Sequence, residues 1–208
     1  MSRSGFFLTF EGADGSGKST QARRLAETLT AQGRDVVLTR EPGGSAGAEE
    51  IRKLLVEGAP ARWSPETEIL LFTAARRDHL ERTILPALQR GAIVISDRFA
   101  DSTRVYQGAA RADLRKTVDQ LHTLMISQEP DLTLVFDIDA DVGLQRGLAR
   151  NSGEDRFEDL GADFQYKLRA GYKALLDDFP DRCVAIDGNA ALDQVAADVL
   201  SAIETHLP

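Results

Sequence analysis

A glycine-rich stretch near the start of the chain has the residue types and spacing of a phosphate-binding loop. Residues 12–20 fit the pattern G-x-x-x-x-G-K-[ST]. Glycines let the backbone adopt positive φ values, and their amide groups approach an anion without a Cβ atom in the way. In this pattern Lys18 places its charge on the β- and γ-phosphates of a nucleotide, and the Ser19 hydroxyl completes a Mg²⁺ shell. The predicted nucleotide site comprises Gly12, Ala13, Asp14, Gly15, Ser16, Gly17, Lys18, Ser19 and Thr20.

The flanking residues supply the context that this motif requires. Residues 6–11 are rich in aromatic and β-branched types and predict a strand, and residues 21–32 carry leucine and alanine at helical spacing. A strand, a loop and a helix in this order direct the loop amides and the helix start toward one anion. A glycine-rich turn that binds no ligand is the alternative interpretation.

Strand and helix patterns alternate along the rest of the chain. Further strands are predicted at 35–39, 92–96, 132–136 and 182–186, and helices at 46–57, 65–89, 113–127, 140–150, 164–179 and 192–206. This alternation implies right-handed crossovers and an α/β fold, a parallel sheet with helices on both faces. We find no repeat or linker, so residues 1–208 are expected to form a single domain, with a polar, mobile segment at 151–163.

Composition narrows the classes of partner. The 208 residues carry a net charge of −8, which disfavours a nucleic acid polymer as partner because such proteins normally present a basic surface. Neither a signal-peptide stretch nor an apolar run long enough for a membrane helix is present, which predicts a soluble, cytoplasmic protein. The single cysteine, Cys183, lies in an apolar run and is expected to be a buried thiol. The three histidines lack metal-ligand spacing and are interpreted as surface or helix residues.

Charged residues follow the predicted strands at the edge where ligands collect in such sheets. The phosphate loop, residues 40–42 and residues 97–99 each follow a strand, so these three turns are expected to converge on one crevice. Asp97 closes an apolar strand, as does the residue that holds Mg²⁺ through water in phosphate-loop proteins. Asp137 is the alternative for that role. Asp97 is favoured because Arg98 beside it supplies a second phosphate ligand.

Three stretches together resemble thymidylate kinases. They are Thr39-Arg40-Glu41-Pro42-Gly43-Gly44, Asp97-Arg98-Phe99 with Ser102-Thr103 and Tyr106-Gln107-Gly108 after it, and the phosphate loop. The resemblance runs from Phe6 to about Asp187. It implies the nucleoside monophosphate kinase fold with a five-stranded parallel sheet, transfer of the γ-phosphoryl group of ATP to dTMP to give dTDP, and a homodimer.

The resemblance also implies roles for individual residues at the dTMP end. Arg98 matches the arginine that grips the acceptor phosphate, and Arg40 is expected to assist it. Phe72 matches the ring that stacks on thymine, and Arg76, on the same helix face, matches the arginine that bonds a thymine carbonyl. The remaining implied contacts are Thr103 and Gln107 at the base edge, Tyr106 under the deoxyribose and Pro42 near the base methyl. Without the resemblance, Phe72 is a core residue and Tyr106 and Gln107 are turn residues before Gly108.

A lid is expected at about residues 147–160. Members of this family place the catalytic arginine either in the phosphate loop or in the lid, and Gly15 occupies the loop position here. The chain therefore resembles the bacterial type, with Arg150 as the transferring arginine, Arg156 as the second choice and Arg146 on adenine. A merely soluble arginine-rich loop is the alternative.

Asp14 has two interpretations. It orients the sugar or an arginine across the crevice, or it bonds its own backbone in a glycine turn.

Two other classes of protein share the phosphate loop, but the guanine-specific N-K-x-D of GTP switches is absent, and partitioning ATPases usually have a lysine early in the loop. Within kinases, the alternative is an enzyme for another pyrimidine nucleotide or a nucleoside. A nucleoside has no acceptor phosphate for Arg98 to bind.

Overall fold

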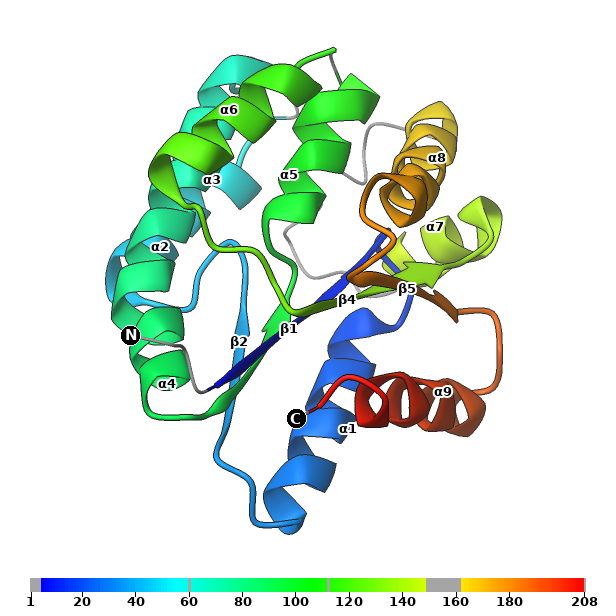
Figure 1. Ribbon diagram of the computed structural model, residues 1–208. Helices are drawn as coiled ribbons and strands as arrows, with labels where there is room; N and C mark the ends of the chain where they lie inside the picture. Colours follow the sequence, from blue (N-terminus) through cyan, green and yellow to red (C-terminus); the bar gives the residue numbers. More distant parts are fainter. Residues whose placement is uncertain (1–4, 60, 112, 149–161, 208) are drawn as a thin grey trace.

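The computed structural model describes residues 5–59, 61–111, 113–148 and 162–207, and its centre is one parallel sheet (Figure 1). The sheet has five strands in the order β2-β3-β1-β4-β5, and every neighbouring pair is parallel. The strands are β1 Phe6–Gly12, β2 Val36–Arg40, β3 Ile93–Asp97, β4 Leu132–Asp137 and β5 Cys183–Asp187. The predicted fold class and all five predicted strands are thus confirmed.

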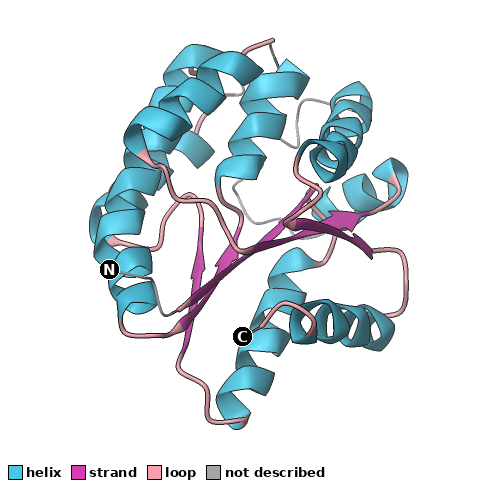
Figure 2. Ribbon diagram, in the orientation of Figure 1, coloured by secondary structure: helices cyan, strands magenta, loops and turns pink. Residues whose placement is uncertain are grey.

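Helices cover both faces of this sheet (Figure 2). α1 and α9 pack together on one face, and α4, α5 and α8 contact the strands from the other, with α2, α3 and α6 beyond them (Figure 1). The bounds are α1 Lys18–Ala31, α2 Ala46–Val56, α3 Pro65–His79, α4 Leu85–Gln89, α5 Ala100–Val105, α6 Arg115–Met125, α7 Ala140–Leu148, α8 Ala162–Asp178 and α9 Leu192–Glu204.

The central strand β1 shows how the sheet divides the core into two layers. Because side chains alternate between the two faces of a strand, Phe6, Leu8 and Phe10 all join the cluster beneath α1 and α9. Phe7 belongs to the cluster on the opposite face, where it meets Phe99 edge-on at 5.0 Å between ring centroids. Every residue of β1 is buried, as expected of a central parallel strand covered on both faces.

The predicted helix over 65–89 is interrupted by a π-helical turn. α3 ends at His79, the turn η1 spans Leu80–Ile84, and α4 begins at Leu85. Pro86 follows immediately and has no backbone N–H to continue the α-helical ladder, which accounts for a break at this point.

The helical segment between β3 and α6 was missed by the sequence analysis. α5 is followed by a second π-helical turn, η2 Tyr106–Arg111, so Tyr106 and Gln107 are helical rather than turn residues. Gly108 had suggested a turn. Its role is a close approach instead, because a Cβ there would lie 3.2 Å from the Cα of Arg115 at the start of α6.

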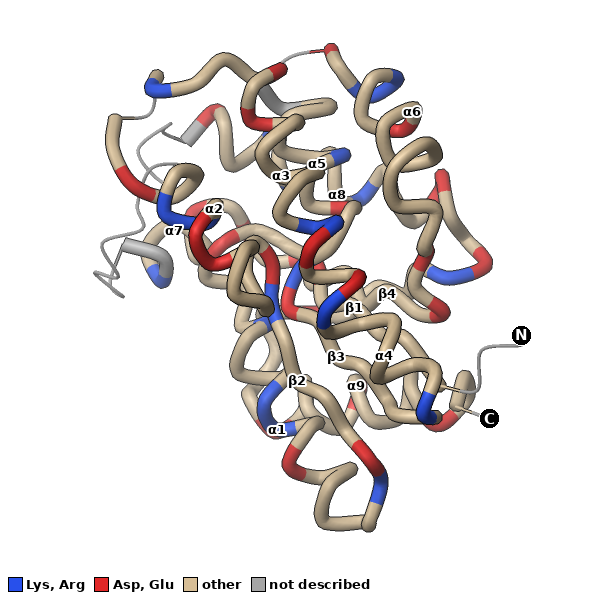
Figure 3. Tube along the Cα trace, turned by 90° about the vertical axis from the view of Figure 1, so that its left-hand side faces the viewer, with Lys and Arg blue, Asp and Glu red and all other residues tan. Residues whose placement is uncertain are grey.

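Charge is mixed over the molecule. In Figure 3 lysine and arginine alternate with aspartate and glutamate along the trace instead of gathering on one face. Among the described residues, no helix combines the length and the apolar character needed to cross a membrane.

Candidate active site

A cavity of about 140 Å³ opens at the carboxyl ends of β1, β2 and β3. The turns after these three strands therefore lie together, as we predicted from a parallel sheet whose strands end at one edge. The lining residues are Asp14, Glu41, Pro42, Arg52, Val56, Phe72, Arg76, Arg98, Phe99, Ser102, Thr103, Tyr106 and Gln107. Seven of the eight residues assigned to dTMP are in this lining, and Arg40 is the exception.

The phosphate loop has the backbone that its glycines predicted. Gly15 and Gly17 have φ values of 78° and 90°, and a Cβ on Gly15 would collide with the carbonyl oxygen of Gly143 in α7. Lys18 is the first residue of α1, and its buried ammonium group donates to the carbonyl of Ala13 at 3.2 Å. The amides at the start of this 14-residue helix face the loop and favour an anion there.

Asp14 joins the phosphate loop to the cavity. Its Oδ1 accepts from Nη2 of Arg98 at 2.7 Å and lies 3.5 Å from Nζ of Lys18, and its Oδ2 accepts from the Tyr106 hydroxyl at 3.0 Å. Burial alone would raise the pKa of Asp14, but the charges of Arg98 and Lys18 and the Tyr106 hydrogen bond hold that pKa well below its ordinary value. Asp14 is therefore ionised near neutral pH and lies between two cations. The interpretation in which it bonds only its own backbone is not supported.

Arg98 contacts the phosphate loop as well as the hydroxyl groups of the acceptor side, and its backbone has an uncommon conformation. Its φ is +71°, uncommon for a residue with a side chain, and its amide donates to the carbonyl of Phe10 at 2.9 Å. Nη1 donates to the hydroxyls of Ser102 and Tyr172, both at 2.9 Å. Although burial opposes it, the neighbouring tyrosine hydroxyls and Asp14 raise the pKa of Arg98 well above its usual range, so the guanidinium stays charged.

Glu11 holds the turn that carries Arg98. Its buried carboxylate accepts from the Phe99 amide at 2.7 Å and from the Ser102 hydroxyl. Burial and the neighbouring charge of Asp101 raise the pKa of Glu11 from 4.5 to about 7. Glu11 is thus a support for the acceptor side of the site.

The predicted base end is built around Arg76. Its Nε donates to Oε2 of Glu41 at 2.7 Å, and its Nη2 donates to Oγ1 of Thr103 at 2.9 Å and to the carbonyl of Phe99 at 3.1 Å. Phe72, one helical turn earlier, lines the cavity beside it and is half-buried. Gln107 is buried and donates to Oε2 of Glu68 at 3.0 Å.

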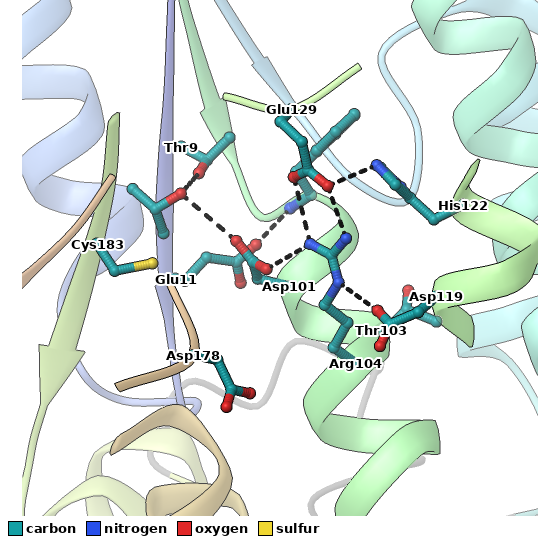
Figure 4. Close-up of polar contacts among 12 residues, drawn as sticks. Thr9, Glu11, Asp101, Thr103, Arg104, Asp119, His122, Glu129, Asp178 and Cys183 are labelled. Atoms are coloured by element: carbon teal, nitrogen blue, oxygen red, sulfur yellow. Dashed lines mark hydrogen bonds and ion pairs between the residues drawn. The ribbon is translucent and has the colours of Figure 1, made fainter. Parts of the chain in front are cut away.

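α5 is fixed by a largely buried charge cluster, which we call the Asp101 cluster and define as Asp101, Arg104, Glu129 and Arg182. Figure 4 shows Asp101, Arg104 and Glu129 of this cluster. Asp101 accepts from Nη1 of Arg104 at 2.7 Å and from both terminal nitrogens of Arg182 at 2.7 and 2.9 Å. Glu129 accepts from Nη2 of Arg104 at 2.7 Å. Because Asp101 immediately precedes Ser102 and Thr103, this cluster sets where both side chains stand.

Two aspartates were candidates for holding Mg²⁺ through water. Asp137 accepts from Nε of Arg169 at 2.6 Å and pairs with Lys173 at 3.0 Å, so its charge is neutralised. Asp97 has a buried Oδ1 without a hydrogen-bond partner among the described residues. Ser16 in the phosphate loop likewise has a buried hydroxyl with no partner in the described part of the chain. These unpartnered oxygens fit a hydrated cation and phosphate, and they favour Asp97 over Asp137.

The other predicted residues are placed as follows. Arg40 is half-exposed and pairs with Glu49 at 3.3 Å outside the cavity. Arg146 is exposed on α7, where its Nη1 donates to the carbonyl of Gly188 at 3.3 Å on the phosphate-loop side of the molecule. Arg150 and Arg156 lie outside the described residues, as does nearly all of the expected lid.

Several residues of the site were missed by the sequence analysis, and two of them make specific contacts there. Arg52 of α2 lines the cavity and donates to the carbonyl of Pro42. Tyr172 of α8 holds Arg98 across a separation of 74 residues. The helical spacing of 164–179 predicted that Tyr172 lies on a helix, but nothing in the sequence indicated which group its hydroxyl meets.

Comparison with known proteins points to one family. The sequence model of a family described as thymidylate kinase matches residues 10–199. The chain is 65% identical over 207 residues to the thymidylate kinase of Ruegeria pomeroyi, covering 100% of this chain and 98% of that protein. It is 68% identical over 201 residues to that of Dinoroseobacter shibae, covering 97% of both. A crystal structure of thymidylate kinase from Ehrlichia chaffeensis superimposes with a TM-score of 0.77 at 35% identity, covering 96% of this chain and 98% of that one. On this evidence the chain belongs to the thymidylate kinase family.

Proposed function

We propose that this protein transfers the γ-phosphoryl group of ATP to dTMP and so produces dTDP. Membership of the thymidylate kinase family supports the reaction. The structural observation that carries it is the position of Arg98, which bonds Asp14 of the phosphate loop and also lines the acceptor cavity. One cation thereby stands where donor and acceptor phosphates must meet.

ATP would lie on residues 12–20, with its phosphates against the loop amides and Lys18. Mg²⁺ would be held by the Ser19 hydroxyl and, through water, by Asp97, and it would neutralise charge on the β- and γ-phosphates. Arg146, exposed beside the loop, is proposed to lie against adenine.

dTMP would occupy the cavity with its phosphate on Arg98. Phe72 would stack on thymine while Arg76 bonds a base carbonyl, and Tyr106 would pack under the deoxyribose. The remaining proposed contacts are Thr103 and Gln107 at the base edge and Pro42 near the base methyl. Arg40 would have to leave Glu49 to assist Arg98, so we give it no direct role.

The chemistry requires positioning more than proton transfer. The acceptor phosphate oxygen is already ionised near neutral pH, so no general base is needed. Lys18 and Arg98 neutralise the charges that must approach, and holding both reactants in line out of water lowers the barrier. Arg150, in the proposed lid at 147–160, is the arginine we assign to the transferred group. Arg150→Ala is expected to lower kcat more than dTMP affinity, and steady-state kinetics that show the reverse would move Arg150 to a binding role.

The protein is further proposed to be a cytoplasmic homodimer. Besides the family resemblance, large apolar side chains are exposed on two neighbouring helices: Leu70 of α3 is 58% exposed, and Leu124 and Met125 of α6 are 76% and 47% exposed. Such side chains on adjoining helices are suited to burial against a second copy.

The decisive experiment is an assay of ADP formation with ATP·Mg²⁺ and a panel of dTMP, dUMP, UMP, dCMP, AMP, GMP and thymidine. We expect activity on dTMP, weaker activity on dUMP and none on the others. ATP hydrolysis without phosphorylation of any acceptor would overturn the kinase assignment and favour an ATP-dependent switch.

A further inference from the structure

His79 occupies the point where α3 meets the end of β2. Its side chain is completely buried, and both ring nitrogens are engaged. Nε2 lies 2.7 Å from Oγ1 of Thr39, and Nδ1 lies 2.9 Å from Oε1 of Glu41. Carboxylate oxygens accept hydrogen bonds, so Nδ1 donates toward Oε1 of Glu41, while Nε2 faces the threonine hydroxyl.

The same carboxylate also holds Arg76. Oε1 of Glu41 meets the imidazole while Oε2 accepts from Nε of Arg76 at 2.7 Å, and the side chains of Glu41 and Arg76 are 3% and 4% exposed. Arg76 continues to Thr103 through Nη2 at 2.9 Å. A continuous hydrogen-bonded chain therefore runs from Thr39 through His79, Glu41 and Arg76 to Thr103.

The turn after β2 closes over the imidazole. Gly44 has a φ of +86°, and a Cβ there would collide with Nε2 of His79 and with Oγ1 of Thr39. Two more hydrogen bonds tie this turn to the same helical segment, from Ser45 to Asp78 and from Thr83 to the carbonyl of Gly44, both at 2.7 Å. The ring is thus clamped on the side away from Glu41, and it has little freedom to move.

Arg76 keeps one nitrogen for a ligand. Nε and Nη2 are taken by Glu41, Thr103 and the Phe99 carbonyl, whereas Nη1 has no hydrogen-bond partner among the described residues. Arg76 lines the cavity, so this nitrogen is available to a base carbonyl there. Its direction depends on how Glu41 fixes the rest of the planar guanidinium.

We propose that His79 is a positioning residue that orients the base-binding arginine through Glu41. Without the imidazole, Oε1 of Glu41 would lose its partner in a buried site, and the carboxylate would turn to recover one. Arg76 would turn with it and present Nη1 poorly. This role rests on the proposed function, because it assumes that a pyrimidine carbonyl meets Arg76.

The test compares three substitutions of His79 in steady-state kinetics with dTMP and ATP varied separately. His79→Asn retains a donor near the position of Nδ1, His79→Gln retains a polar group near that of Nε2, and His79→Leu retains neither. Loss of one hydrogen bond to a charged group in a buried site predicts a rise of about tenfold in KM for dTMP in the Gln and Leu variants. The KM for ATP and kcat should change less than about threefold, because Lys18 and Arg98 are untouched, and the Asn variant should recover most of the dTMP affinity.

A double-mutant cycle separates positioning from general loosening of the fold. In an Arg76→Met background, His79→Gln should cause no further rise in KM for dTMP, because the group it positions is gone. His206→Gln, at an exposed histidine that follows α9 and lies outside the cavity, is the control and should leave KM for dTMP unchanged.

The possible outcomes distinguish a failure of the role of His79 from a failure of the proposed function. An unchanged KM in His79→Gln, or an equal rise in the Arg76→Met background, overturns the role of His79 and leaves the proposed function standing. If His79→Leu and His79→Gln do not fold, the Asn variant alone decides. A KM for dTMP in folded His79→Asn that stays far above the wild-type value then overturns the role of His79. A wild-type protein that does not act on dTMP overturns the proposed function itself.

Discussion

At the scale of single residues, the site is organised by charges that neutralise one another before any substrate binds. Asp14 lies between Lys18 and Arg98, the two cations that the reaction uses on the donor and acceptor phosphates. In the absence of nucleotide this carboxylate keeps two buried cations from repelling each other. The phosphates of bound nucleotides would also reduce the repulsion between Lys18 and Arg98.

Lys18→Ala should abolish most turnover while leaving the fold intact. Lys18 donates to the carbonyl of Ala13 and pairs with Asp14, both within its own loop, so we expect its loss to leave the apolar core intact. We expect kcat/KM for phosphoryl transfer to fall by about 10³-fold or more, the scale for removing a preorganised charge from the transition state. Circular dichroism should show an unchanged helix content. Near-normal turnover in the folded variant would remove Lys18 from the mechanism.

Glu11 should make stability depend on pH in the direction opposite to an ordinary paired carboxylate. Its pKa is raised from 4.5 to about 7, chiefly by burial, so the folded protein holds a proton that the unfolded chain releases. Its contribution to the free energy of unfolding is therefore complete below about pH 4.5 and is lost as pH rises through 7. The stability of wild type relative to Glu11→Gln, measured by urea unfolding between about pH 5 and pH 8, should fall with rising pH. If the difference in the free energy of unfolding between wild type and Glu11→Gln does not change over this pH range, Glu11 is ionised in the folded protein throughout it.

At the scale of secondary-structure elements, α5 has a supporting role larger than its six residues suggest. It begins shortly after the strained Arg98 and carries Ser102 and Thr103 into the cavity. The Asp101 cluster joins this helix to the turn before β4 and to the start of β5, and the ring of Phe179 lies beneath the guanidinium of Arg182 at 4.2 Å. The position of the acceptor pocket therefore depends on groups on the far side of α5.

Asp101→Asn should destabilise the protein strongly. Asp101 is 1% exposed and pairs with both Arg104 and Arg182, so its neutralisation leaves two buried guanidiniums without full compensation. A loss of about 3 kcal/mol or more in the free energy of unfolding is expected. Asp119→Asn is the matched control, because Asp119 also pairs with Arg104 but is 41% exposed, and it should cost below about 1 kcal/mol. If urea denaturation shows the same loss in the free energy of unfolding for Asp101→Asn and Asp119→Asn, burial of the Asp101 cluster does not add to stability.

At the scale of the whole molecule, the exposed apolar side chains of α3 and α6 lie away from the cavity. Arg77 of α3 donates to the carbonyl of Met125 at 2.8 Å, so the two helices are joined at this surface. A second copy seated here would cover Leu70 and Leu124 without blocking the site.

Leu124→Glu should weaken the proposed homodimer. Leu124 is 76% exposed, so the substitution costs the isolated chain little, whereas a charge buried in an apolar interface is unfavourable. Light scattering should show a dimer for wild type and mainly monomer for the variant at micromolar concentration. Leu192→Glu, on α9 at 54% exposure, is a control that should remain dimeric. A monomeric wild type would contradict the homodimer, and a dimeric Leu124→Glu would place the interface elsewhere.

Local patterns in the sequence were sufficient for the phosphate loop, the five strands and the residues at their carboxyl ends. Each depends on neighbours along the chain: Gly15 and Gly17 need positive φ, Lys18 must start a helix, and Arg98 must follow a buried strand. The convergence of the turns at 40–42 and 97–99 follows from the rule that parallel strands end at one edge. The family resemblance then identified Phe72, Arg76 and Tyr106 before their common cavity was known.

Only the tertiary structure decided which side chains hold those residues in place. His79 had no spacing that marked it, yet it is buried against Glu41, 38 residues earlier, and Tyr172 bonds Arg98 across 74 residues. Arg40 sits in the most recognisable turn but points to Glu49 instead of the cavity. The physical reason is that backbone periodicity and helix starts are set by adjacent residues, whereas the partner of a buried polar group is set by which elements pack together around it.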